Sequence, residues 1–188
     1  MRASRRRAGF SLAEMVVVIL VAGVTASVVV PRFALSDSQR AYTSALRLAD
    51  DLDRVRERAI ERETNARLLF DATGGAYDGF LDADHDGSFA YTGAERDSLA
   101  VMASRAVEPP VRFGRGARAP VPGFPAADAV SFDGAAITFD ARGLLYPMGD
   151  RGVIYLHADD EPDALAAVTV TGAGQVRVWR WSERERWE

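Results

Sequence analysis

An uncharged apolar run near the start of the chain predicts a long hydrophobic helix. No charged residue occurs between Met15 and Pro31, and the apolar character begins at Phe10. Residues 10–31 supply about the 20 residues that an α-helix needs to cross a bilayer. Pro31 removes one backbone hydrogen-bond donor, so we expect the helix to kink or unwind there. We therefore predict a transmembrane helix over residues 10–31.

A second, amphipathic helix is predicted over residues 32–64. Ser36 and Gln39 have the spacing of a capping box, which marks a helix N-terminus. Apolar residues then recur at intervals of three and four, as one face of a helix requires: Tyr42, Ala45, Leu46, Ala49, Leu52, Val55, Ala59 and Ile60. The other face is charged and is expected to be solvated: Asp50, Asp51, Arg54, Glu57, Arg58, Glu61 and Arg62.

Residues 65–188 have the alternating pattern of β-strands separated by Gly, Asp and Pro clusters. The predicted strands are Ala66–Asp71, Ala76–Asp82, Leu99–Ser104, Ala136–Asp140, Gly152–His157, Ala167–Thr171 and Gln175–Trp181. Gly174 predicts a tight hairpin before the last strand. The segment Val107–Ala127 is too long for a plain connection, and such loops are functional or disordered. An antiparallel sheet that buries the Leu46, Leu52 and Ile60 stripe gives an α+β domain.

Composition excludes several classes of function. The formal net charge is −4 and becomes −8 without Arg2 and residues 5–7, so the chain is a poor candidate for bulk nucleic-acid binding. Cysteine is absent, so the fold depends on its core, or on a bound metal, without disulfides. Only His85 and His157 are available as histidines, and no nucleophile–base spacing accompanies them. We expect no enzyme and no required cofactor.

The residues that precede the apolar run indicate where the chain is processed. Residues 5–7 are arginines, which the positive-inside rule keeps in the cytoplasm. Glu14 places a carboxylate in the apolar helix at a cost of about 2.5–3.5 kcal/mol. Cleavage between Gly9 and Phe10 creates a cationic amine that can pair with Glu14 of the same or a neighbouring subunit. The alternative, a secretory signal cut after Ala26, leaves Glu14 unexplained.

Residues 9–14 read Gly-Phe-Ser-Leu-Ala-Glu, which resembles the type IV prepilin signature, and Pro31 falls where pilin helices carry a proline. The segments 48–60, 137–156 and 168–178 are similar to GspH/FimT-type pseudopilins. The resemblance implies a pilin-like fold in which a long N-terminal helix, half transmembrane and half amphipathic, packs on an antiparallel β domain.

The resemblance also implies how the chain is processed and assembled. Residues 1–9 would be a leader that prepilin peptidase removes before methylating Phe10, and Glu14 would guide assembly. The partners would be other pilins, bound through the N-terminal helix, and the inner-membrane assembly platform. The mature chain would be a minor pilin-like subunit of a type II secretion system or type IV pilus, near the tip of a short periplasmic filament. It would cross the inner membrane once, with its N-terminus cytoplasmic and residues 65–188 periplasmic.

An acidic loop predicts a second site. Asp82, Asp84 and Asp86 alternate and precede a turn glycine, as in the first half of an EF-hand calcium loop. The twelfth position, where a bidentate Glu belongs, is Gly93, and Glu95 follows two residues later. These four carboxylates are the candidate calcium ligands. The alternative for this loop is an acidic hairpin without metal. If the loop binds calcium and the chain is not a pilin-like subunit, the protein would be an ordinary membrane-anchored periplasmic calcium-binding module.

The C-terminal strand offers a third candidate site. Arg177, Arg180 and Trp181 combine arginine with an aromatic ring, which suits contact with a nucleic-acid backbone and stacking on bases. Relatives linked to DNA uptake carry Gly-Arg-x-Arg here, whereas this chain has Gln175 at the first arginine. The alternative is an edge strand with core-facing tryptophans. DNA-binding minor pilin is thus a secondary hypothesis, and we do not expect DNA as a partner.

Overall fold

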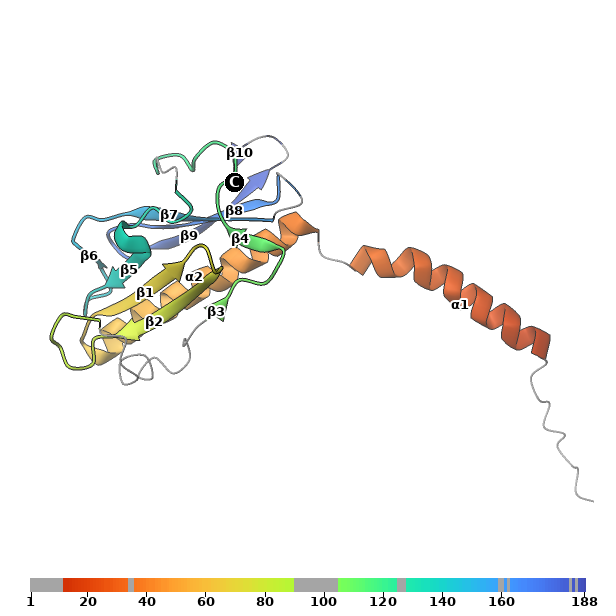
Figure 1. Cartoon of the computed structure of the whole chain (residues 1–188), viewed down its shortest axis with the longest axis horizontal. Coiled ribbons are helices and arrows are strands. Elements are labelled where there is room, and N and C mark those ends of the chain that lie inside the picture. Colours follow the sequence, from red (N-terminus) through yellow and green to blue (C-terminus); the bar gives the residue numbers. More distant parts are fainter. Residues whose placement is uncertain are drawn as a thin grey trace, which may run out of the picture. The chain divides into compact units, whose positions relative to one another are not determined.

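The computed structural model describes residues 12–33, 36–89, 105–124, 128–158, 161, 163–182, 184 and 186–188 (Figure 1). Gly9, Phe10, Glu95 and the predicted strand Leu99–Ser104 lie outside these ranges. The chain divides into two units, Met1–Leu35 and Ser36–Glu188, and each is described by itself.

The first unit contains helix α1, Leu12–Phe33. Its 22 residues include Pro31, and the helix continues for two residues beyond it. The side chains described along α1, from Leu12 to Val24, are all exposed, and most are large and apolar. Within the part of the chain that the structure describes, no helix is both long enough and apolar enough to cross a membrane.

The second unit begins with helix α2, Asp37–Arg62. The predicted capping box is confirmed: the Gln39 backbone N–H donates to Ser36 Oγ at 3.3 Å, and the Ser36 N–H donates to Gln39 Oε1 at 3.3 Å. The helix begins five residues later than the predicted segment 32–64, because Ser36 is the N-cap. It ends at Arg62, and Glu63, with a left-handed backbone (φ 52°), is its C-cap.

The buried face of α2 differs from the predicted stripe. Leu46 and Ile60 are exposed, whereas Leu52, Val55 and Ala59 are buried as predicted. The complete buried set is Ala41, Ala45, Leu48, Ala49, Asp51, Leu52, Val55 and Ala59. Asp51 was predicted on the solvated face, and that prediction is wrong. Four of these eight buried residues are alanines.

The strands form two antiparallel sheets, each with five strands among the described residues. The first has the order β3-β2-β1-β5-β6, with β1 Ala66–Asp71, β2 Ala76–Leu81, β3 Arg105–Ala106, β5 Ala136–Phe139 and β6 Leu145–Tyr146. A short 3-10 turn, η1 Asp133–Ala135, leads into β5. The second has the order β10-β9-β8-β7-β4, with β4 Val111–Phe113, β7 Gly152–Ala158, β8 Leu165–Val170, β9 Val176–Ser182 and β10 Arg186–Trp187.

Helix α2 contacts both sheets, and the main core lies between them (Figure 1). The α+β class and six of the seven predicted strands are confirmed, with ends shifted by at most two residues. The hairpin at Gly174 (φ 73°) is also confirmed, since the Thr171 N–H donates to the Gln175 carbonyl. Strands β3, β4, β6 and β10 were not predicted, because two or three residues are too few to show an alternating pattern.

The segment after β4 covers the outer face of the second sheet. Val121 is buried in a small cluster with Val153, Tyr155 and Ala167. The Val121 N–H donates to the Tyr155 hydroxyl at 3.0 Å. The predicted loop Val107–Ala127 therefore contains a strand and a packed covering segment as far as it is described. Strand β8 is buried along its whole length because both faces of this sheet are covered.

A buried carboxylate joins α2 to the first sheet. The Tyr77 hydroxyl donates to Asp51 Oδ2 at 2.7 Å, and Arg105 Nε lies 3.3 Å from the same oxygen. Arg54 donates to Asp51 Oδ1 at 3.1 Å. The pKa of Tyr77 lies well above its ordinary value. Burial is the larger cause, and the hydrogen bond to Asp51 is the second. The partners of Asp51 come from α2, β2 and β3, so a helical period alone could not place this residue in the core.

Candidate functional site

Only part of the predicted N-terminal processing site falls within the described residues. Glu14 lies in the first turn of α1 and is exposed. A carboxylate is favourable there, because the unpaired backbone N–H groups of a helix N-terminus carry partial positive charge. Pro31 lies within α1, near its end. The cleavage site itself remains a prediction.

Helix α1 presents apolar side chains around its whole circumference. Its exposed large side chains include Leu12, Met15, Val16, Val17, Val18, Ile19, Leu20, Val21 and Val24. Consecutive residues of a helix point in directions about 100° apart, so this run leaves no polar face. A helix that is apolar all round is stable only when other apolar surface covers it. The described side chains of α1 therefore form a continuous exposed apolar surface.

The acidic loop follows directly from the end of β2 and is anchored at its first residue. The Thr64 hydroxyl donates to the Asp82 carbonyl oxygen at 2.6 Å, and the Asp82 N–H donates to the Asn65 carbonyl at 2.9 Å. Asp82 is thereby held against the turn between α2 and β1, and only 1% of its surface is exposed. Thr64 was not predicted to be part of this site, because its contact with Asp82 spans 18 residues of sequence.

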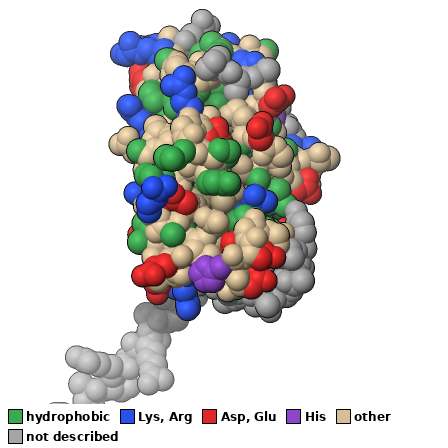
Figure 2. Space-filling model, turned by 90° about the vertical axis from the view of Figure 1, so that its left-hand side faces the viewer, with side chains coloured by type: hydrophobic (Ala, Val, Ile, Leu, Met, Phe, Trp, Pro, Cys, Tyr) green, Lys and Arg blue, Asp and Glu red, His purple; other side chains and the backbone are tan. Residues whose placement is uncertain are grey.

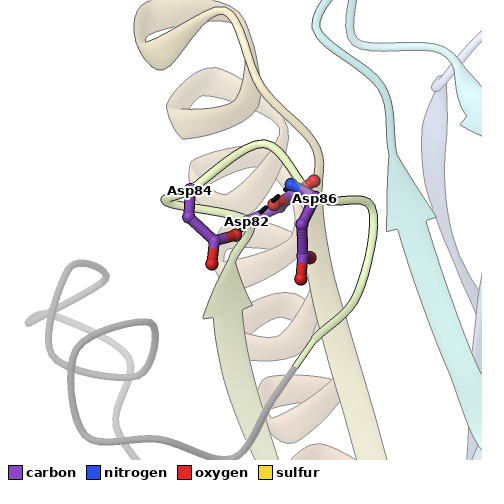
Figure 3. Close-up of side chains that lie close together, drawn as sticks. All are labelled: Asp82, Asp84 and Asp86. Atoms are coloured by element: carbon purple, nitrogen blue, oxygen red, sulfur yellow. Dashed lines mark hydrogen bonds between the residues drawn. The ribbon is translucent and has the colours of Figure 1, made fainter.

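The loop folds so that the three predicted carboxylates lie together. One oxygen from each of Asp82, Asp84 and Asp86 lies within 4.8 Å of the others (Figure 3). Gly87 adopts φ 76°, a conformation that suits glycine, and its N–H donates to Asp82 Oδ2 at 3.1 Å. The sharp turn predicted at this glycine is therefore present.

Hydrogen bonds shape the exposed part of the loop. The Ser88 hydroxyl donates to Asp86 Oδ2 at 3.0 Å, and its N–H donates to Asp86 Oδ1 at 2.6 Å. These two bonds hold the pKa of Asp86 below its usual range. The Asp86 N–H donates to Asp84 Oδ1 at 3.3 Å. All three carboxylates are thus positioned by the loop backbone, and His85 between them is exposed.

The structure does not bring Arg177, Arg180 and Trp181 together on one surface. Alternate residues of a strand point to opposite faces, so Arg177 and Arg180 of β9 diverge. Arg180 extends toward α2, where it donates to Ser38 Oγ at 3.2 Å. Arg177 stacks on Trp179 with its guanidinium 4.0 Å from the ring centroid. Trp181 is buried, as the alternative of core-facing tryptophans predicted.

The charges visible on the end of the domain are mixed. Figure 2 shows acidic and basic side chains interspersed with small hydrophobic groups on the face turned to the viewer. A protein that binds the phosphate backbone of DNA concentrates its basic side chains in a patch or stripe. The face drawn in Figure 2 has no such concentration among its coloured residues.

Comparison with known proteins bears on two features of the chain, its N-terminal segment and its fold. Residues 4–30 match the family model of the prokaryotic N-terminal methylation motif. Among solved structures, the chain is similar to the type IV minor pilin FimU of Pseudomonas aeruginosa, with a TM-score of 0.50 and 13% identity over 73% of this chain and 87% of FimU. The minor pseudopilin EpsH from the Type 2 Secretion System of Vibrio cholerae matches with a TM-score of 0.47 and 15% identity, over 74% of this chain and 95% of EpsH. A search of curated proteins by sequence found no match.

The chain therefore joins an N-terminal methylation motif to a domain with a pilin-like fold. Both features were predicted from the sequence, and they are confirmed as an N-terminal methylation motif and a pilin-like fold. At 13% identity, the likeness to FimU concerns the fold.

Proposed function

We propose that this protein is a minor pilin-like subunit that assembles into a filament through its N-terminal helix. The observation that carries the proposal is the methylation motif at residues 4–30, which includes most of α1, a helix whose described side chains are apolar on every side. Packing α1 against the equivalent helices of other subunits would keep this apolar surface out of water once the subunit leaves the lipid. Burial of a Leu or Val side chain contributes about 1.5–3 kcal/mol relative to exposure to water, so packing between these helices would hold the subunit in the filament.

Glu14 gives the assembly its register. In the proposed mature chain, the methylated amine of Phe10 pairs with Glu14 of a neighbouring subunit and offsets the cost of burying that carboxylate. Because a mispositioned helix leaves a buried charge unpaired, the pair selects one axial offset between neighbouring helices.

The location of the subunit forms part of the same proposal. Before processing, the arginines at residues 5–7 would hold the N-terminus in the cytoplasm, with the chain anchored in the bacterial inner membrane and its β domain in the periplasm. Prepilin peptidase and the inner-membrane assembly platform are the partners this route requires. The machine served would be a type II secretion system or a type IV pilus, in which a minor subunit starts or caps a short filament.

The N-terminus of the mature protein tests the proposal. Mass spectrometry of protein extracted from membranes should find N-methylated Phe10 as the first residue. A mature chain that begins at Ser27 instead would indicate secretory cleavage and would refute the proposal.

The charge on Glu14 provides a second test, scored by cross-linking to other pilins. Glu14→Gln should leave cleavage and recovery in the membrane fraction intact, yet reduce cross-linked filament strongly. Glu14→Asp keeps the charge and serves as the matched control, so it should retain more assembly. Equal assembly of both variants and the wild type would contradict the role of the charge pair.

A further inference from the structure

The acidic loop after β2 contains a buried oxygen that its own protein surroundings leave unsatisfied. Asp82 is 1% exposed, and its Oδ2 accepts the Gly87 N–H. Its Oδ1 is also buried, and it has no hydrogen-bond partner among the described residues. A buried carboxylate oxygen without a donor is costly, so such an atom indicates a ligand.

The carboxylates of Asp84 and Asp86 lie beside that of Asp82. One oxygen from each aspartate lies within 4.8 Å of the others. Two oxygens bound to a single Ca²⁺ at about 2.4 Å can be at most about 4.8 Å apart, so the three oxygens are close enough to share one ion. Figure 3 shows the three side chains gathered around the turn of the loop, with Asp84 and Asp86 extending to the same side.

We propose that Asp82, Asp84 and Asp86 bind a calcium ion. Carboxylate oxygens are hard ligands, which Ca²⁺ and Mg²⁺ prefer and which softer transition metals do not select. Ca²⁺ is favoured because it accepts irregular sets of six to eight oxygens, whereas Mg²⁺ demands a near-octahedral set at about 2.0–2.1 Å. Three aspartates from one short loop, completed by water, form an irregular set.

The expected affinity is modest. Two of the three ligands, Asp84 and Asp86, are exposed, so solvent competes for the ion and screens its attraction to the carboxylates. Calcium sites of extracellular modules have dissociation constants of about 10⁻⁴–10⁻³ M, and this site should fall in that range.

Calcium here would fasten the loop to the domain. Asp82 is already tied by its backbone to Thr64 and Asn65, at the end of α2. Farther along, Phe89 lies under the Arg67 guanidinium, 4.0 Å from ring centroid to Cζ, and so closes the loop over β1. An ion shared by Asp82, Asp84 and Asp86 would connect the exposed part of the loop to this fixed base. Calcium binding by this loop does not depend on filament assembly.

Calorimetric titration of the full chain in detergent, after removal of divalent ions with EGTA, tests the proposal. Calcium chloride should bind at one site with a dissociation constant of about 10⁻⁴–10⁻³ M. Asp84→Asn keeps the acceptor for the Asp86 N–H but removes one charge, so it should weaken binding at least tenfold. Asp133→Asn makes the same change on exposed η1 and should leave binding unchanged.

Thermal unfolding gives a second readout that does not depend on heat of binding. At ten times the dissociation constant, calcium should raise the folded-to-unfolded ratio about 11-fold in wild type, and much less in Asp84→Asn. No binding in wild type, an equal response of Asp84→Asn, or an equal response to magnesium would overturn the proposal.

Discussion

The contrast between Asp50 and Asp51 provides a strict test of the packing described for α2. These adjacent aspartates carry the same charge, and both bind Arg54. Asp50 is exposed, whereas Asp51 is buried and also accepts the Tyr77 hydroxyl. Replacing each by alanine makes the same chemical change in two environments.

The expected costs follow from what each substitution leaves behind. Asp51→Ala removes the acceptor of a buried hydroxyl, which costs about 1–3 kcal/mol, and loses hydrogen bonds to a charged group. The side chains of Arg54 and Arg105 are 44% and 39% exposed, so water can solvate them and they add little. We expect a total near 3 kcal/mol for Asp51→Ala and about 0.5 kcal/mol or less for Asp50→Ala.

A double-mutant cycle separates the hydrogen bond from the other contacts of Asp51. Tyr77→Phe alone should cost about 1.5 kcal/mol, because Asp51 loses a donor. In the double variant Asp51→Ala/Tyr77→Phe, the hydroxyl donor and its carboxylate acceptor are both removed, so neither is left buried without the other. The double variant should therefore be more stable than the sum of the single changes predicts, by about 1–2 kcal/mol.

Urea unfolding of the full chain in detergent measures these values. Tryptophan fluorescence reports on the β domain, because Trp179, Trp181 and Trp187 all belong to β9 and β10. Equal destabilisation by Asp50→Ala and Asp51→Ala would refute the buried position of Asp51. Additive effects of Asp51→Ala and Tyr77→Phe would refute the energetic coupling.

Two further predictions concern alkaline pH and a close backbone contact. Burial, reinforced by the hydrogen bond to Asp51, raises the pKa of Tyr77 in the folded state, so the stability that neutral Tyr77 contributes is complete below about pH 10 and is lost as the pH rises further. The urea midpoint of the wild type should therefore fall above pH 10, and that of Tyr77→Phe should fall less. An equally steep fall of the midpoint with pH in Tyr77→Phe would contradict this assignment. At Gly174 (φ 73°) a Cβ would overlap the carbonyl oxygen of Gly143, so Gly174→Ala should cost more than about 2 kcal/mol in urea unfolding. In the control, Gly123→Ala (φ 83°), the added Cβ meets no atom of the described residues within 4 Å, so the change should cost only the backbone strain of about 1–2 kcal/mol. Equal costs of the two substitutions would refute the contact.

Local patterns along the chain were sufficient for the two helices, the longer strands and the N-terminal motif. The capping box at Ser36, the hairpin at Gly174 and the longer strands depend on neighbouring residues and on a period of two or 3.6. The same holds for the turn at Gly87, where closely spaced aspartates precede a glycine. The methylation motif lies within one contiguous segment, so it too could be recognised from the sequence.

Tertiary structure decided which faces are buried and which residues meet. A helical period places Asp51 on the charged side of α2, but Tyr77 and Arg105 from two strands supply its partners, and so Asp51 is buried while Leu46 is exposed. Arg177 and Arg180 are close in sequence, yet the strand directs them to opposite faces. The unsatisfied oxygen of Asp82 arises only where Thr64 and Asn65 hold the start of the loop against the domain. Burial of a polar group depends on the elements that surround it, and those come from distant parts of the chain.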